Sequence, residues 1–185
     1  MLPYIRYVFS FLLPIVFLWP VVGYAAQDTR SILIICSYNP AAHQTSVTIS
    51  DFMDEYTRCG GKYNIEIENM NCKSFSEAPQ WKGMMQQILS KYTETQRPEL
   101  IILLGQEAWA SYLSQEDSLV AQIPVMCSLT SRNAVILPED TINLKEWMPE
   151  SVDFVSDDLG HHKVRAGFVY EYDIEGNIQL LKHLY

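Results

Sequence analysis

The chain has 185 residues and a formal net charge of −9, with 22 aspartates and glutamates against 13 lysines and arginines. Such an acidic chain lacks the basic surface that proteins use to bind phosphate backbones, so nucleic-acid binding is excluded as a function class. The length is sufficient for one domain with a hydrophobic core of its own.

Residues 1–25 have the layout of a secretory signal. One basic residue, Arg6, precedes an uncharged run over residues 8–22, and the small residues Ala25 and Ala26 follow. The alternative is an uncleaved anchor in the inner membrane, but the run has only about 15 residues, prolines interrupt it, and a span needs roughly 20. We therefore predict cleavage after Ala25 and a mature periplasmic or otherwise extracytoplasmic domain with a charge of about −10.

A buried strand and an amphipathic helix are predicted next. Residues 31–37 form a nearly continuous apolar run of strand length, as expected for a strand covered on both faces. Apolar side chains then recur at helical spacing from Ile49 to Tyr56, and a glycine at position 60 or 61 can end that helix in a left-handed cap. The alternating segment 62–70 predicts a second strand with one wetter face, near a sheet edge.

The same order repeats in the middle of the chain. The peptide "SEAPQ" is a helix start signal, and a second helical stripe runs from Trp81 to Tyr92. Residues 100–104 predict a third buried strand, followed by a helix over about 107–113 and a fourth strand over 123–128.

The last part of the sequence is less regular. Residues 132–163 are polar and predict a long excursion that holds short pieces of structure. The peptide "VRAGFVYEY" predicts a returning strand, and "DIEGNIQLLKHLY" predicts a helix in which Ile178, Leu181 and Tyr185 share a face. That stripe has no partner where the sequence stops, which we interpret as a truncation or as the first part of a longer protein.

Strands and helices that alternate in this order predict the α/β class, with a doubly wound, mostly parallel sheet and right-handed crossovers. The expected domain is a Rossmann-like or flavodoxin-like lobe over residues 31–170.

The four cysteines are Cys36, Cys59, Cys72 and Cys127. An even number in an exported chain permits two disulfides. Cys36 and Cys127, however, each end an apolar run, where a small buried thiol is the commoner role. No pair has CxxC spacing, so zinc binding and thioredoxin-like redox chemistry have little support. We favour free, mostly buried thiols, with two disulfides as the alternative.

Polar residues or glycine follow three of the predicted strands, in "CSYNP", "GQEAW" and "CSLTSRN". In an open parallel sheet, ligands bind outside the carboxyl ends of the strands. The first two of these peptides also lead into helix N-termini, whose free N–H groups favour an anion or a carbonyl. We therefore expect Ser37, Tyr38 and Asn39 at the rim of a ligand cleft.

Each of these residues also has a structural explanation. Ser37 and Asn39 are typical caps of a following helix. Gly105 is typical of a turn that needs unusual backbone dihedrals. Glu107 complements a helix dipole, and Tyr38 is as readily explained by packing. The convergence of these residues on one edge favours a cleft.

Catalytic and cofactor motifs are missing. Ser37 has no GxSxG peptide around it. His161 and His162 are adjacent, so on a strand they point to opposite faces; with Asp157 and Asp158 they make at most a loose metal site, and a solvated loop is favoured. The sequence has no P-loop and no GxGxxG. We therefore predict no catalytic residue, no metal and no cofactor.

Several peptides together resemble a known family: "ILIICSYNP", "TSVTISDFMDEY", "IEIENMNCKSF", "PELIILLGQEAW", "IPVMCSLT" and "AGFVYEYDIEGNIQLLKHLY". They look like the amino-terminal lobe of periplasmic-binding-protein-like sensor regions, of the ABC-transporter substrate-binding-like family. Members stand at the front of membrane-bound two-component histidine kinases or act as free solute-binding proteins. The resemblance covers residues 31–185 and implies two Rossmann-like lobes that clasp a small ligand.

The resemblance also implies positions for the site. The first lobe's side of the cleft would be lined by Ser37, Tyr38, Gly105, Gln106, Glu107, Ser128 and Thr130, and the crossover would hold Tyr170, Glu171 and Tyr172. Residues 171–185 would form that hinge crossover and the start of a second-lobe helix. The sequence departs from the family in lacking the rest of the second lobe, a later membrane helix and a kinase core.

The resulting hypothesis is a non-enzymatic small-molecule-binding lobe, the front fragment of a sensor histidine kinase. The ligand would be sugar-like or aromatic, since tyrosines such as Tyr38 and Tyr170 can stack on it. Further partners would be the inner membrane, through the missing downstream part, and a second copy of the full-length sensor. The alternatives are a solute-binding component of an ABC-type importer and, as a third class, a secreted flavodoxin-like hydrolase that uses Ser37 or His43.

Overall fold

The computed structural model describes residues 30–92, 96–116, 122–137, 147–148, 150–153, 162–171 and 173–184. The predicted signal, residues 1–25, lies outside the described residues, as do Tyr172 and the metal-site candidates Asp157, Asp158 and His161. Within these ranges, no helix combines the length and the apolar composition that crossing a membrane requires.

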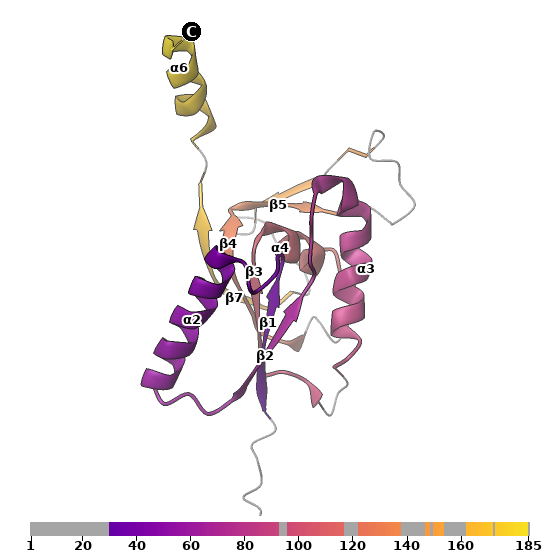
Figure 1. Ribbon diagram of the computed structural model, residues 1–185. Helices are drawn as coiled ribbons and strands as arrows, with labels where there is room; N and C mark the ends of the chain where they lie inside the picture. Colours follow the sequence, from indigo (N-terminus) through magenta and orange to yellow (C-terminus); the bar gives the residue numbers. More distant parts are fainter. Residues whose placement is uncertain are drawn as a thin grey trace, which may run out of the picture.

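A five-stranded parallel sheet forms the centre of the fold (Figure 1). Its strands are β1 (Ser31–Cys36), β2 (Asn64–Asn69), β3 (Leu100–Leu104), β4 (Val125–Ser131) and β7 (Val164–Tyr170). Their order is β2-β1-β3-β4-β7, and all four neighbouring pairs are parallel. The predicted fold class is therefore confirmed: this is a doubly wound α/β lobe of the Rossmann or flavodoxin kind. β2 stands at the edge, as its alternating pattern predicts.

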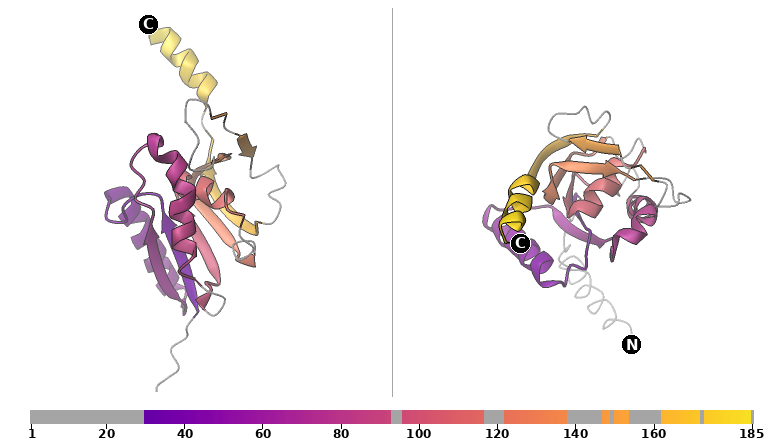
Figure 2. Two further views of the ribbon diagram at one scale, coloured as in Figure 1. Left: turned by 90° about the vertical axis from the view of Figure 1, so that its right-hand side faces the viewer. Right: turned by 90° about the horizontal axis from the view of Figure 1, so that it is seen from above.

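Helices cover both faces of the sheet (Figure 2). Helix α2 (His43–Arg58) packs on one face, where Ile34 and Cys36 of β1 meet Ile49. Helices α3 (Ala78–Leu89) and α4 (Gln106–Leu113) pack on the other face, against Leu33 and Ile35. Because β1 is covered on both sides, all six of its residues are buried, which explains its unbroken apolar sequence.

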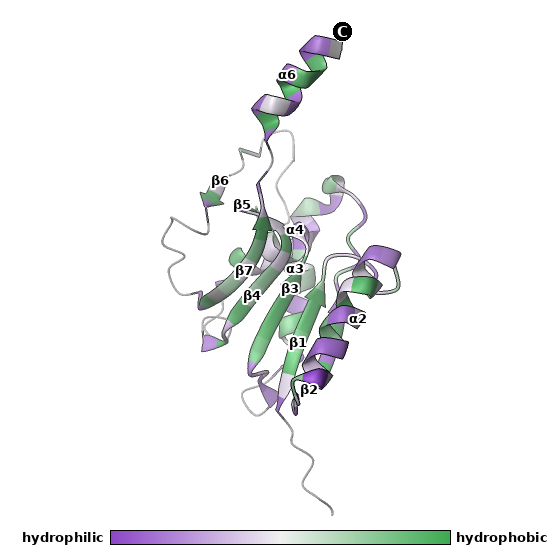
Figure 3. Cartoon of the chain, turned by 90° about the vertical axis from the view of Figure 1, so that its left-hand side faces the viewer, coloured by the Kyte–Doolittle hydropathy of each residue, from purple (hydrophilic) through white to green (hydrophobic). Residues whose placement is uncertain are grey.

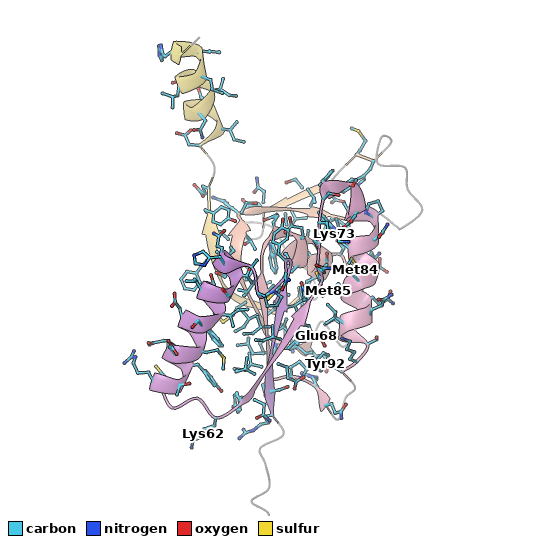
Figure 4. All side chains as sticks on the ribbon, viewed as in Figure 1. Lys62, Glu68, Lys73, Met84, Met85 and Tyr92 are labelled. Atoms are coloured by element: carbon cyan, nitrogen blue, oxygen red, sulfur yellow. The ribbon has the colours of Figure 1, made fainter. Side chains whose placement is uncertain are left out.

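The α3 side holds the larger core, whose side chains are drawn in Figure 4. Met85 on α3 is fully buried there, and its neighbour Met84 is partly buried. A short 3₁₀ turn, η1 (Phe75–Glu77), precedes α3 and places Phe75 edge-on to Trp81. The predicted stripe extended to Tyr92, but α3 ends at Leu89, and the Tyr92 amide instead closes a turn by donating to the Leu89 carbonyl.

The end of α2 follows its glycines. Gly60 has φ +74° and takes the left-handed position after the cap residue Cys59. The Gly61 amide donates to the Tyr56 carbonyl at 2.8 Å, and the Gly60 amide donates to the Thr57 carbonyl at 3.0 Å. This is a Schellman motif, and it identifies Gly60 as the capping glycine of the two candidates.

The fourth strand differs from its prediction. It runs over Val125–Ser131 and not over 123–128, and its pairing with β7 is interrupted between Cys127 and Thr130. Leu129 lies in this interruption with φ +57°, an unusual value for a leucine. A bulge of this kind depends on the neighbouring strand, so the apolar pattern of β4 alone could not reveal it.

The polar excursion contributes a second, antiparallel sheet of β5 (Asn133–Ile136) and β6 (Glu150–Asp153). Ala134 and Leu137 of this region are buried in the core beside α4. The last helix, α6 (Ile174–Leu184), stands away from the sheet (Figures 1 and 2). All four cysteine thiols are free; Cys36, Cys72 and Cys127 are buried, and Cys59 is exposed.

Candidate functional site

The carboxyl ends of β1 and β3 form the topological switch point of the sheet. From β1 the chain crosses to β2 on one side, and from β2 it returns to β3 on the other side of β1. The loops therefore diverge between β1 and β3, which is where open α/β sheets bind ligands. A cavity of about 380 Å³ lies here, lined by Tyr38, Gln44, Thr45, Leu104, Gly105, Gln106, Glu107, Leu129 and Tyr170. We call it the switch-point cavity.

Gly105 and Ser37 together build the floor of this cavity. Gly105 precedes α4 with φ +103° and, as a glycine, has no side chain to cap the helix. The Ser37 hydroxyl instead accepts the Ala108 N–H at 2.9 Å, which is the amide that a capping side chain normally binds. A Cβ on Gly105 would lie 2.5 Å from Ser37 Oγ. The glycine is therefore required both by its backbone angle and by the serine beneath it.

Tyr38 and Glu107 connect the two strand ends above that floor. The Tyr38 hydroxyl donates a hydrogen bond to Oε1 of Glu107, a residue in the first turn of α4. This bond to a carboxylate, and secondly burial, raise the pKa of the Tyr38 phenol above its usual value. Tyr38 is therefore a neutral donor at physiological pH, and it fixes the position of the Glu107 carboxylate.

The opposite wall of the cavity comes from β4 and β7. The Tyr170 hydroxyl donates to the Leu129 carbonyl at 2.9 Å. The Gln106 amide oxygen accepts the Ser131 N–H at 2.8 Å, and its NH₂ group donates to the Asn133 carbonyl at 3.0 Å. Both ends of the Gln106 amide thus join α4 to the β4–β5 turn, so this side chain mainly holds the wall in place.

A second cavity of about 490 Å³ lies beside the first and shares Tyr170 with it; we call it the arginine cavity. Arg132 binds Asp153 there through Nε, at 2.9 Å to each carboxylate oxygen, and lies 3.4 Å from Glu171 Oε1. Hydrogen bonds to Asp153 first and then to Glu171 raise the pKa of the Arg132 guanidinium. The positive charge of Arg132 is therefore already neutralised by these two carboxylates.

Five of the residues predicted for the site line the switch-point cavity, and these are Tyr38, Gly105, Gln106, Glu107 and Tyr170. Ser37 lies beneath it, fully buried, with its hydroxyl engaged. Glu171 lines the arginine cavity instead. Tyr172 is outside the described residues.

Three further predicted residues lie elsewhere. Asn39 forms a local turn, because its Oδ1 accepts the Ala41 N–H at 2.9 Å. Ser128 lines an apolar cavity on the α2 face of the sheet. Thr130 is fully buried, with its hydroxyl 3.7 Å from the Cys127 sulfur. The suggestion that Ser37 or Asn39 caps the following helix is wrong, since the cap residue of α2 is Ala42 and Ser37 caps α4.

Sequence reasoning missed four lining residues: Gln44, Thr45, Leu129 and Leu104, the last residue of β3. Gln44 and Thr45 occupy the first turn of α2, and the rule that ligands meet helix N-termini at the switch point would have included that turn. Leu129 had no such signal, because it reaches the cavity through the irregularity in β4.

Two of the histidines, His43 and His162, can also be placed. His43 is exposed at the first position of α2 and is absent from the cavity lining. A His162 ring nitrogen lies 3.0 Å from the Leu113 carbonyl, and its ring packs on Tyr112 at 5.2 Å between centroids. In the described part of the chain, no three histidine, cysteine, aspartate or glutamate side chains are grouped as a metal site would require.

Comparisons with known proteins give little beyond this geometry. No family model matches the chain, and no curated protein matches it. Among solved structures, an NADH-dependent butanol dehydrogenase A from Thermotoga maritima aligns at 15% sequence identity with a TM-score of 0.39. That alignment covers 75% of this chain and 36% of the dehydrogenase.

Proposed function

We propose that this chain is an extracytoplasmic lobe that binds a small molecule without transforming it, in the sensor region of a membrane-bound two-component histidine kinase. The observation that carries the binding role is the switch-point cavity, which brings Tyr38, Glu107 and Tyr170 together from three separate segments. The sensor context comes from the family resemblance of the sequence and from the predicted export signal.

The cavity has the character of a ligand site. Its volume of about 380 Å³ is within the range of small-molecule pockets, which start near 300 Å³. Tyrosine rings provide flat apolar contact, and a carboxylate provides one strongly polar group, which is the combination that fixes a ligand's orientation.

The same geometry disfavours a hydrolase that uses Ser37. The Ser37 side chain is fully buried, and its oxygen accepts the Ala108 N–H. A nucleophilic serine needs an exposed hydroxyl and a base that takes its proton. The engaged position beneath Gly105 supports a structural role for Ser37.

A thermal-shift screen of the chain against sugars and amino acids tests the binding role, because a ligand that binds the folded form raises the melting temperature. We expect at least one compound to raise the Tm of the wild type and to lose that effect in Tyr38→Ala. Phe75→Ala is the matched control, because Phe75 is an exposed aromatic residue that does not line the cavity. This variant should keep the increase in Tm. A screen with no response, or a hydrolase activity that Ser37→Ala abolishes, would contradict the proposal.

The sensor context has a separate test in the coding sequence beyond Tyr185. A second lobe, a membrane span and a kinase core there would support the sensor, with its inner-membrane attachment and dimer of full-length chains. A second lobe without a membrane span, beside genes for a permease and an ATPase, would favour the importer component instead.

A further inference from the structure

The lining of the switch-point cavity carries a single kind of charge. Apart from two tyrosines, Glu107 is the one ionisable residue among the described residues that line the cavity. No lysine, arginine or histidine is among them. This charge bears on the chemistry of the ligand, on the premise that the cavity has the binding function proposed above.

Glu107 has one oxygen engaged and one available. Oε1 accepts the Tyr38 hydroxyl, whereas Oε2 has no hydrogen-bond or ion-pair partner among the described residues. Oε2 also lies close to the Gly105 backbone, 3.6 Å from the position that a Cβ would take there. The carboxylate is therefore held in place in the cavity lining, just above the floor, with part of its hydrogen-bonding capacity unused.

No described cation of the chain neutralises this carboxylate. Arg132 is directed to Asp153 and Glu171 in the arginine cavity. The chain as a whole carries a net charge of −9. A half-buried carboxylate without a positive partner attracts a cation and repels an anion that approaches it.

The tyrosines add a second preference for a cation. Tyr38 and Tyr170 line the same cavity and are 47% and 43% exposed, so a part of each ring is accessible to a ligand. The face of an aromatic ring attracts a cation as well as a flat apolar group.

A helix N-terminus such as the first turn of α4 generally favours an anion or a carbonyl, but here the chain's own groups already occupy part of it. Glu107 already supplies a carboxylate in this turn, and Ser37 already occupies the Ala108 N–H. The chain's own groups thus take the place that a bound anion would occupy.

We propose that the ligand of the switch-point cavity carries a protonated amine that binds Glu107, with an apolar portion that lies against Tyr38 and Tyr170. Two sources share this chemistry: a simple organic amine, and an amino acid whose carboxylate faces the first turn of α2 at Gln44 and Thr45.

Four probes of similar size separate these possibilities: benzylamine, phenylalanine, benzyl alcohol and benzoate. Titrations of the isotope-labelled chain follow the Gly105 amide signal by NMR, which also detects millimolar binding. We expect benzylamine or phenylalanine to bind, and benzyl alcohol and benzoate to bind at least about tenfold more weakly, as for the loss of one charge-assisted contact.

Glu107→Gln keeps the shape of the side chain and removes its charge. We expect it to weaken binding of the amine about tenfold and to leave the binding of benzyl alcohol unchanged. Glu99→Gln is the matched control and should bind like the wild type. Glu99 is exposed and directly precedes the first residue of β3, at the amino end of that strand and away from the cavity. If benzylamine is preferred over phenylalanine the ligand is a simple amine, and the reverse indicates an amino acid; both support the proposal.

Two results overturn it and can be told apart. If benzyl alcohol or a neutral sugar shifts the Gly105 signal as strongly as benzylamine does, and Glu107→Gln binds like the wild type, the cavity binds ligands but does not select an amine. If none of the four probes and no sugar or amino acid shifts that signal, the proposed binding function itself fails.

Discussion

On one face of the sheet, α3, α4 and the β5–β6 sheet bury a cluster of 20 residues, whereas the cluster between α2 and the other face has four, counted over the described chain. Figure 3 shows the α2 face, where the strands are strongly apolar beside a helix that covers only part of them. A cavity of about 380 Å³ remains there, lined by apolar side chains that include Phe52, Met126 and Phe168.

The comparison of the two faces shows that an apolar strand sequence does not by itself bury the strand's side chains. Val169 of β7 packs against the large core, and the adjacent Phe168 points to the α2 face and is 72% exposed. Alternation along a strand sends successive side chains to opposite faces, but only a covering helix removes them from water. The α2 face is therefore apolar in sequence and incompletely buried in the structure.

The largest expected effect is on the well-covered face. Trp109 on α4 is fully buried in the large core, so Trp109→Ala should lower the free energy of unfolding by about 3–5 kcal/mol. Chemical denaturation followed by circular dichroism measures it. A loss below about 1 kcal/mol would mean that this core is loosely packed.

A buried thiol on each face makes stability depend on alkaline pH. Burial raises the pKa of Cys36, on the α2 face, from its usual 9 to about 11, and burial together with the nearby Glu107 and Glu77 carboxylates raises that of Cys72 to about 12. Above pH 9 the unfolded chain loses these protons while the folded chain keeps them. The free energy of unfolding should thus fall as pH rises from about 9, by at most about 1.4 kcal/mol per unit for each thiol.

Urea denaturation between about pH 8 and 11 measures this dependence and compares the two faces. Cys72→Ala should flatten the profile over a wider pH range than Cys36→Ala, because its folded-state pKa is higher. A profile of Cys36→Ala/Cys72→Ala with the same slope as the wild type would show that other groups cause the loss.

The packing at the carboxyl ends of β1 and β3 depends on Gly105. Gly105→Ala should cost about 3 kcal/mol, because it strains a positive φ and places a Cβ against Ser37 Oγ. Gly60→Ala is a matched control with a positive φ but open space around it, so about 1 kcal/mol is expected. If both variants lose the same free energy of unfolding, the contact between a Cβ at position 105 and Ser37 does not contribute to the loss.

The smallest effect is expected on the exposed part of the α2 face. Phe168→Ala should change the free energy of unfolding by no more than about 0.5 kcal/mol, since most of this side chain is already in water. The same denaturation experiment as for Trp109→Ala measures it. A loss of several kcal/mol would show that the face is covered in solution.

Local patterns in the sequence determined the elements of this protein. The apolar run of β1, the helical stripe of α2 and the glycine that ends it follow from side-chain spacing and backbone freedom within one segment. The alternation of these segments was sufficient for the fold class, and the rule for strand ends was sufficient to suggest Tyr38, Gly105 and Glu107.

Only the tertiary structure decided which of those residues meet and what each one does. Ser37 caps a helix that begins far along the chain, Tyr38 binds Glu107 across two strand ends, and Leu129 enters the cavity through a bulge. These contacts join segments that the sheet order brings together, and the spacing within a single segment contains no information about them. The physical reason is that periodicity records which face a side chain takes, whereas a site depends on which other segment lies opposite that face.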